Sequence, residues 1–289
     1  MKKSTLLLLT LALTAVPAAL RAADSAEPKR IEIHSTQELI NNLGSDRTLV
    51  LVEEYYNISE TLLDPQNARL AVEYTALENN KKCVYYVEAF DGPELHIADF
   101  KNLTIEAGIE VVSIVTEPRY VNVFTFENCS NVTLKGLTLG HTEEGYCDNG
   151  VLGFTRCSGF QVIDCDLYGC GTEGIMVTSC SEMFFKGTKI RDCSYHIMHL
   201  LSSSNIRFDS CQFFRNREFE LLNVYDCDDV LFYNCMFANN TGMLFNVCSP
   251  VTFKDCVVLH DSDFLGDTEN VFWINSILEE YFGENQALG

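Results

Sequence analysis

Short blocks of alternating apolar and polar residues return at nearly constant intervals along the middle of the chain. Alternation of this kind is typical of half-buried β-strands, and a period of about 20 to 50 residues indicates a repeat architecture. The spacings between successive blocks are 29, 28, 23, 23, 24 and 21 residues. Aligned on one shared position, the blocks fall at Phe100, Cys129, Cys157, Cys180, Ser203, Cys227 and Cys248.

Each block has room for three short strands. Apolar side chains stand five and three residues before the shared position, three and five after it, and, from the second repeat on, mostly apolar or small ones eight and ten after it. Residues that bend a chain, such as Ser181 and Gly187 in the repeat at Cys180, come between these pairs. The pattern therefore predicts an all-β solenoid of about seven to nine coils, with three short strands per coil.

The first 22 residues differ in composition from the repeats. Lys2 and Lys3 precede an apolar stretch from Leu6 to Ala15, and small residues follow. This order is typical of a cleaved secretory signal peptide, and the apolar stretch is too short for a membrane span. We expect a bacterial-type signal and export to the periplasm, cell surface or exterior. A buried N-terminal helix is the alternative, and no other segment could span a bilayer.

Both ends of the solenoid need covers, because an exposed apolar edge would pair with other chains. Residues 23–94 are predicted to hold a polar leader, a capping helix and irregular first coils. The helix starts with the capping box from Ser35 to Glu38, and Gly44 is its expected end. Residues 95–268 form the regular repeats. Residues 269–289 hold a last strand around Trp273 and a C-terminal cap, with a closing helix expected over residues 277–282.

The formal net charge is −21, and it becomes −24 once the signal peptide with its three basic residues is removed. Such a surface repels nucleic acid and anionic membranes, and it disfavours polyuronates unless a divalent cation bridges the two anions. The alternative is that the charge serves solubility alone. We expect a monomer, and the sequence contains no cofactor motif.

Thirteen cysteines are present, and most recur at equivalent repeat positions. Equivalent residues of stacked coils lie about 4.8 Å apart, so their Cβ atoms lie a little beyond disulfide range. We therefore predict that most are free thiols packed as small apolar groups, although disulfides stay open. A zinc site is the alternative, but the usual Cys-x-x-Cys spacing is missing. The first position holds Cys129, Cys157, Cys180, Cys227 and Cys248, the second Cys165, Cys211, Cys235 and Cys256, and the third Cys170 and Cys193, while Cys83 and Cys147 lie outside.

Three stretches carry a resemblance to a known family. They are the helix and strand leading to Tyr55-Tyr56-Asn57-Ile58-Ser59, the segment from Leu95 to Glu106, and the repeated pattern Asn-Cys-Ser-Asn-Val-Thr-Leu at 128–134. Over roughly residues 31–276 the chain resembles the right-handed parallel β-helix proteins of the pectate-lyase-like superfamily. The resemblance implies a single-stranded right-handed parallel β-helix. It implies little about activity, because the superfamily includes lyases, glycoside hydrolases, adhesins and non-catalytic surface proteins.

In enzymes of that superfamily the outer face of the first strand of each coil lines the substrate groove. Here the outward positions contain no Lys or Arg and one carboxylate. The resemblance to lyases would imply a basic residue beside calcium-binding acids, and the hydrolase tripeptides Gly-His-Gly and Arg-Ile-Lys are absent. The predicted substrate-binding residues are Glu127, Thr155, Thr178, His199, Asn223, Tyr225 and Asn246.

The densest group of candidate acids and bases lies around His196 to Tyr225. A histidine beside a carboxylate can transfer a proton at neutral pH. The connection from His141 to Gly150 is the longest, and it is expected to fold over the groove. No metal site is predicted, because the two histidines belong to a turn and a strand and need not converge. The candidate catalytic residues are His199, His196, Tyr225, Glu173 and Glu220.

Three hypotheses remain open. The first is an exported module that recognises a polysaccharide or another surface polymer along its strand face without turnover. The second is a polysaccharide-degrading hydrolase or lyase. The third is a structural or adhesive envelope protein. The missing basic residues and hydrolase tripeptides favour the first and third, and whether the protein is an enzyme stays undecided.

Overall fold

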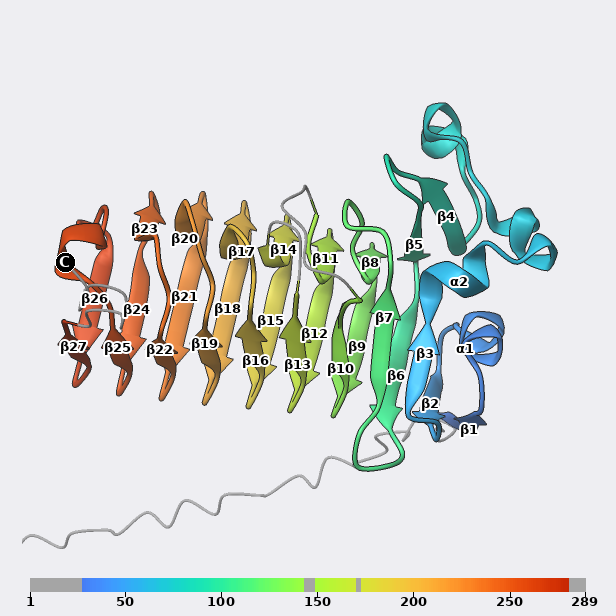
Figure 1. Ribbon diagram of the computed structural model, residues 1–289, viewed down its shortest axis with the longest axis horizontal. Coiled ribbons are helices and arrows are strands. Elements are labelled where there is room, and N and C mark those ends of the chain that lie inside the picture. The colour runs from blue at the N-terminus through green and yellow to red at the C-terminus, as the bar shows by residue number, and fades with distance from the viewer. Residues whose placement is uncertain (1–27, 143–148, 170–172, 281–289) are drawn as a thin grey trace, which may run out of the picture.

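Three parallel sheets wrap around one continuous core in a parallel β-helix of about eight or nine coils (Figure 1). The computed structural model describes residues 28–142, 149–169 and 173–280. Strands of equal rank in successive coils pair in register, as the repeat pattern predicts. The predicted fold class is therefore confirmed. The antiparallel pair β4–β5 is the exception near the N-terminal end.

We name the sheets A, B and C. Sheet A contains β1 (Lys29–Ile33), β2 (Arg47–Leu51), β6 (Lys101–Ala107), β9 (Ser130–Lys135), β12 (Ser158–Ile163), β15 (Ser181–Lys186), β18 (Ser204–Asp209), β21 (Asp228–Tyr233), β24 (Val251–Lys254) and β26 (Val271–Ile274). Sheet B contains β3 (Tyr55–Asn57), β7 (Ser113–Thr116), β10 (Thr138–His141), β13 (Asp166–Tyr168), β16 (Lys189–Arg191), β19 (Gln212–Phe214), β22 (Met236–Ala238), β25 (Val257–Leu259) and β27 (Ile277–Glu279).

Sheet C is formed by the first strands of the coils. It contains β4 (Val84–Glu88), β5 (Pro93–Ala98), β8 (Phe124–Glu127), β11 (Leu152–Thr155), β14 (Glu173–Thr178), β17 (His196–Leu201), β20 (Glu220–Tyr225) and β23 (Met243–Val247). The described helical segments are α1 (Thr36–Asn42), α2 (Ile58–Leu62), η1 (Pro65–Leu70), η2 (Tyr74–Asn79) and η3 (Ser262–Phe264).

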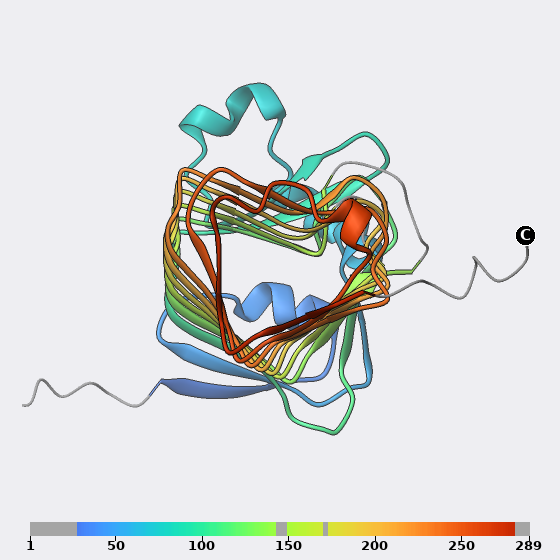
Figure 2. The ribbon, with the colours of Figure 1, turned by 90° about the vertical axis from the view of Figure 1, so that its left-hand side faces the viewer.

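Helix α1 covers the N-terminal end of the core. The Ser35 hydroxyl accepts a hydrogen bond from the Glu38 backbone N–H at 3.2 Å, which satisfies one of the free donors of the first turn. Leu39 and Ile40 are buried in the core, and α1 lies across the interior in the view along the coils (Figure 2). The predicted capping helix is confirmed, although it ends at Asn42 with Leu43 as its C-cap, before Gly44.

Phenylalanines stack along the inner face of sheet A. Phe208 and Phe232 lie 4.6 Å apart with ring planes within 7°, and Phe232 and Phe253 lie 4.7 Å apart within 9°. Trp273 continues the stack at 4.9 Å from Phe253. Because the coils repeat at the strand spacing of about 4.8 Å, one large apolar residue per coil fills the interior without gaps.

The cysteine columns are explained by hydrogen bonds between coils. The Cys157 backbone N–H donates to Cys180 Sγ at 3.2 Å, and the Cys180 N–H donates to Ser203 Oγ at 2.9 Å. Thiol and hydroxyl therefore fill the same role, that of a small acceptor for the coil before. All cysteines that the structure describes are free, and all of them except Cys83 and Cys248 are buried. Cys147 and Cys170 lie outside the described residues.

One assignment in the last repeat is wrong. The repeat pattern predicts Cys248 in the first column, so that Met243, five residues before it, points inward and Leu244 points outward. The structure buries Ser249 and Leu244, while Cys248 and Met243 are exposed, and Ser249 Oγ accepts from the Cys227 N–H at 3.0 Å. The stretch from Leu244 to Ser249 is one residue shorter than that from Leu221 to Cys227, so the column position moves to the serine.

The expected closing helix is wrong where it is described. Ile277–Glu279 is strand β27, which pairs with β25 in register. Ser276 accounts for the continued coil, because its hydroxyl accepts from the Cys256 N–H at 3.0 Å, as the thiols of the column do. The repeat pattern thus extends one strand further than predicted.

Thiol reactivity should follow this packing. In the native protein we expect a maleimide to modify Cys248 rapidly and the buried column thiols only after unfolding, because burial removes reagent access. At Cys165 burial also raises the pKa to about 12. Site mapping by mass spectrometry reads each cysteine separately, and Cys248→Ser should remove the fast reaction. Rapid native modification of Cys157 or Cys235 would contradict the packing.

Candidate polymer-binding face

Two rows of outward side chains cross sheet C from strand to strand, and we call this surface the sheet C face. The strands of sheet C, as the structure describes them, contain no Lys or Arg. The first row is His96, Thr125, Gly153, Met176, His199, Asn223 and Asn246. The second row is Ala98, Glu127, Thr155, Thr178, Leu201 and Tyr225.

Near the C-terminal end, several predicted site residues come together. The rings of His199 and Tyr225 lie 6.2 Å apart at 59°. Burial lowers the pKa of His199, and the neighbouring His196 adds to the effect. His199 is therefore neutral at pH 7, with one ring nitrogen to donate and one to accept.

His196 lies beside Asn223. Its Nδ1 contacts the Glu220 carbonyl oxygen, which has no proton to give, so Nδ1 carries the proton. Asn223 Nδ2, which lies 3.0 Å from the same nitrogen, then donates to the Glu220 carbonyl at 3.1 Å instead. Asn246 Nδ2 donates to Asn223 Oδ1 at 2.8 Å. The result is a line of imidazole and amide groups across three strands.

The carboxylates predicted for this region do not join the cluster in the same way. Glu173 pairs in register with His196 and is only 4 % exposed. Glu220 takes part through its backbone carbonyl in the bonds to His196 and Asn223. The cluster thus offers imidazole and amide groups that can hydrogen-bond to a ligand.

A second cluster on the same face joins the predicted Glu127 to two residues that the sequence analysis missed, Tyr85 and His96. Glu127 Oε1 lies 2.7 Å from His96 Nδ1 and accepts from the Tyr85 hydroxyl at 3.0 Å. The rings of Tyr85 and His96 stack at 4.9 Å with planes within 12°. The hydrogen bond from His96 holds the pKa of Glu127 below its usual value, and burial, followed by the charge of Glu127, raises that of Tyr85.

Since Glu127 is ionised, His96 Nδ1 donates its proton in the hydrogen bond to the carboxylate. His96 and Glu127 keep 14 % and 24 % of their side chains exposed, so a ligand in the groove could reach them. The charge of Arg156, directly after β11, also lowers the pKa of Glu127.

A buried network supports this end of the face. Glu94 is 8 % exposed, and its carboxylate accepts from Thr125 Oγ1, from Asn122 Nδ2 at 3.0 Å and from Asn149 Nδ2 at 3.1 Å. The bonds join β5, β8 and the segment before β11. These hydrogen bonds hold in place the residues that surround His96, which gives a binding site the rigid support that it needs.

The two clusters are separate centres on one surface. Glu127 on β8 and His199 on β17 are three strands apart, which corresponds to about 14 Å at the usual strand spacing. Thr155 and Thr178 lie in the second row between them. The predicted binding residues therefore lie on one polar face, with ring systems at both of its ends.

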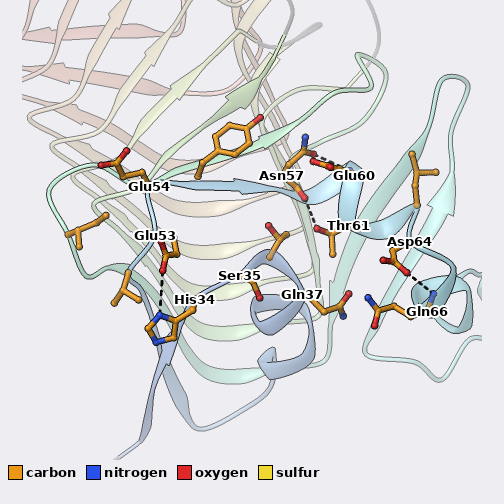
Figure 3. Close-up of a pocket in the computed structure, with 15 residues that line it drawn as sticks. His34, Ser35, Gln37, Glu53, Glu54, Asn57, Glu60, Thr61, Asp64 and Gln66 are labelled. Carbon is orange, nitrogen blue, oxygen red and sulfur yellow. Dashed lines mark hydrogen bonds and ion pairs between the residues drawn. The ribbon is translucent and has the colours of Figure 1, made fainter.

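A cavity of about 990 Å³ lies elsewhere, beside α1 and α2 (Figure 3). Its polar lining serves the local helices: Ser35, Asn57 and Asp64 are the N-caps of α1, α2 and η1. His34 points to Glu53 at 3.5 Å across its rim. Helix capping accounts for Ser35, Asn57 and Asp64, and we assign no candidate chemistry to this cavity.

Three histidines should make stability depend on pH. Burial lowers the pKa of His141, His199 and His260 in the folded chain. As the pH falls through about 6.5, the unfolded chain takes up these protons before the folded chain does.

The free energy of unfolding should therefore drop between pH 7 and pH 5, by at most about 1.4 kcal/mol per pH unit for each histidine. Urea unfolding at several pH values measures the drop. His141→Gln should make it smaller, and the same change at the exposed His34 should not. A rise in stability toward pH 5 would contradict the assignment.

Some predictions stay untested or fall outside what is described. The loop predicted to fold over the groove includes residues 143–148, which lie outside the described residues. Within residues 28–142, 149–169 and 173–280, no three His, Cys, Asp or Glu side chains gather closely enough to hold a metal ion. No helix in those same ranges is long and apolar enough to cross a membrane.

The comparisons with known proteins agree on the fold. A family model described as a right-handed beta helix region matches residues 122–270. A direct search of curated protein sequences finds no match.

Three solved structures each superpose with a TM-score of 0.52. A pectate lyase from Bacillus sp. N165, in complex with trigalacturonate, is 12 % identical, with 87 % of this chain and 82 % of that chain covered. A pectate lyase from Paenibacillus sp. 0602 is 10 % identical, with 89 % and 79 % covered. An alginate lyase from Paenibacillus sp. str. FPU-7 is 10 % identical, with 88 % and 95 % covered. At these identities the likeness establishes the fold alone.

Proposed function

Because the chain belongs to the right-handed β-helix family, in which the fold does not determine activity, we propose that it is an exported protein that recognises a polysaccharide on the sheet C face without cleaving it. The observation that carries the proposal is the double row across the face, in which hydroxyl, amide, imidazole and phenol groups outnumber the interrupting residues Gly153, Met176, Ala98 and Leu201. Sugars are recognised by such neutral donors and acceptors, and the face is long enough for several sugar units.

Two further observations support this function. The similar pectate lyase was solved with trigalacturonate, so a fold of this kind can hold an oligosaccharide. The signal-like residues at the N-terminus fit a protein that meets polymers outside the cytoplasm. The free energy of binding would come from many modest hydrogen bonds and ring contacts along the face, as in other extended sites.

Affinity electrophoresis in gels that contain neutral or acidic polysaccharides tests the proposal. We expect at least one polymer to retard the protein and Tyr225→Ala to weaken this retention about tenfold. Tyr233→Ala is the matched control, because Tyr233 ends a strand of sheet A with similar partial exposure. Equal losses for both variants, or no retardation of the wild type by any polymer, would overturn the proposal.

A polysaccharide-degrading enzyme is a second candidate, favoured by the Tyr85–His96–Glu127 cluster. The Glu127 carboxylate orients the His96 ring through Nδ1, which is how a carboxylate positions a histidine for acid–base chemistry at its other nitrogen. The wild type would then release reducing ends or unsaturated products from the same polymers, and His96→Gln would lower the rate by about 10²-fold to 10⁴-fold. Binding by the wild type without any product would eliminate this candidate.

A further inference from the structure

The connection before β20 contains an unusual backbone. Glu218 and Phe219 both have left-handed conformations, with φ of 49° and 51°. In this region Cβ approaches the following carbonyl oxygen, so a bulky residue here is an outlier. Such outliers persist where the surroundings or a function hold them.

The coils on either side have shorter connections. Two residues separate Cys193 from His196 and Asn240 from Met243, whereas three separate Asn216 from Glu220. In the following coil Gly242, with φ of 108°, lies against this segment, and a Cβ there would come within 2.7 Å of the Phe219 carbonyl oxygen. The extra residue therefore creates a bulge. The left-handed backbone of this bulge would by itself favour glycine.

The bulge presents an aromatic ring. Phe219 is 59 % exposed, and its ring meets that of Tyr195 edge to face at 4.9 Å. Tyr195 in turn lies 6.4 Å from the ring of His196, which contacts Asn223 on the sheet C face. The two aromatic rings, which we call the aromatic edge, thus border the polar row at His199 and Asn223.

The charges around the aromatic edge distinguish between classes of sugar. Glu218 and Glu220 flank Phe219, the nearby cation is Arg217, and the described strands of sheet C contain no basic residue. With a formal net charge of −21 on the whole chain, a polyanion is repelled. A neutral pyranose ring, which has an apolar C–H face and hydroxyl edges, fits both the rings and the amides.

We propose that Phe219 and Tyr195 form a stacking subsite for a neutral pyranose unit, and that this subsite selects neutral polysaccharides over polyuronates. The subsite depends on the proposed function, because the other sugar units of a bound polysaccharide would lie along the sheet C face. The strained backbone at Phe219 is retained because it holds the exposed ring against that of Tyr195, at the border of the sheet C face.

Paired glycine variants of the full chain test the subsite. Phe219→Gly removes the ring and relieves the strain, whereas the matched control Glu218→Gly relieves a similar strain and keeps the ring. We expect Phe219→Gly to weaken binding to galactan, xylan or glucomannan about tenfold, with Tm unchanged or about 2 °C higher. Glu218→Gly should bind like the wild type, with a similar effect on Tm.

The outcomes separate this inference from the proposed function. If Tyr225→Ala weakens binding and Phe219→Gly does not, the subsite is wrong and the binding face stands. Wild-type binding to polygalacturonate or alginate in preference to the neutral polymers would overturn the neutral class. If the wild type binds none of these polymers, the subsite falls together with the binding face. A large fall in Tm for Phe219→Gly would show that the ring is structural.

Discussion

Replacing Phe232 with alanine is expected to lower the free energy of unfolding by about 3 to 5 kcal/mol. The ring is fully buried and stacked between Phe208 and Phe253. Its loss would leave a cavity that the neighbouring coils, held in register by sheet A, cannot close. Denaturant unfolding followed by circular dichroism measures the change, and hydrogen exchange should locate the loss of protection in the coils around β21.

Tyr233→Ala is the control for this change, because Tyr233 is the next residue on the same strand and points outward. Its removal should lower the free energy of unfolding by about 1 kcal/mol or less, since it is partly exposed and contacts Arg207 and Lys254 through their charges. If the two variants lost equal stability, the stacked aromatic core would not be the main support of these coils.

Placing a charge at Leu39 is expected to unfold the N-terminal coils or make the protein aggregate. Leu39 is fully buried where α1 covers the end of the core, and an unpaired carboxylate there lacks any compensating partner. We expect Leu39→Asp to lower the free energy of unfolding by at least about 3 kcal/mol and to produce concentration-dependent light scattering.

Asn41→Asp on the exposed side of the same helix provides the matched control. Asn41 accepts hydrogen bonds from Gln37 and Arg69 through Oδ1, and a carboxylate keeps both. This variant should stay monodisperse with nearly wild-type stability. A stable, monodisperse Leu39→Asp protein would mean that α1 is not needed to cover the solenoid.

Most of the fold could be predicted because each coil repeats the same burial problem. Inward apolar residues equivalent to Ile175, Val177 and Phe185 recur in the regular coils. Stacked parallel strands in register are the arrangement that buries all of them. The repeat pattern does not fix turn lengths. Ser249 replaced Cys248 in the column because one residue is missing before it, a difference that alignment on cysteines conceals.

The candidate site was predicted only in part, for a related reason. His199, Asn223 and Tyr225 follow from strand alternation, and the structure places them on one face. His96 lies between the inward residues Leu95 and Ile97, so strand alternation places it outward, whereas the predicted site residues begin with Glu127 in the second repeat. Tyr85 comes from the antiparallel pair β4–β5, which has no counterpart in the repeats.

The left-handed backbone at Phe219 is even harder to predict from the sequence. The sequence around it contains no glycine, and its conformation follows from one extra residue between Asn216 and Glu220. Contacts that depend on turn length, such as those of Tyr195 with Phe219, require coordinates. Patterns with a fixed period determine the scaffold, whereas the irregular connections determine which side chains meet beside the sheet C face.

Hydroxyl-radical footprinting of the protein with and without a retained polysaccharide tests the central claim most directly. A polymer bound on the sheet C face should protect Tyr225 and His199, and Phe219 if the stacking subsite is occupied, while Tyr233 on sheet A and the exposed Phe272 on β26 keep their oxidation rates. Protection confined to sheet A, sheet B or the cavity beside α1, with Tyr225 and His199 unchanged, would contradict recognition on this face.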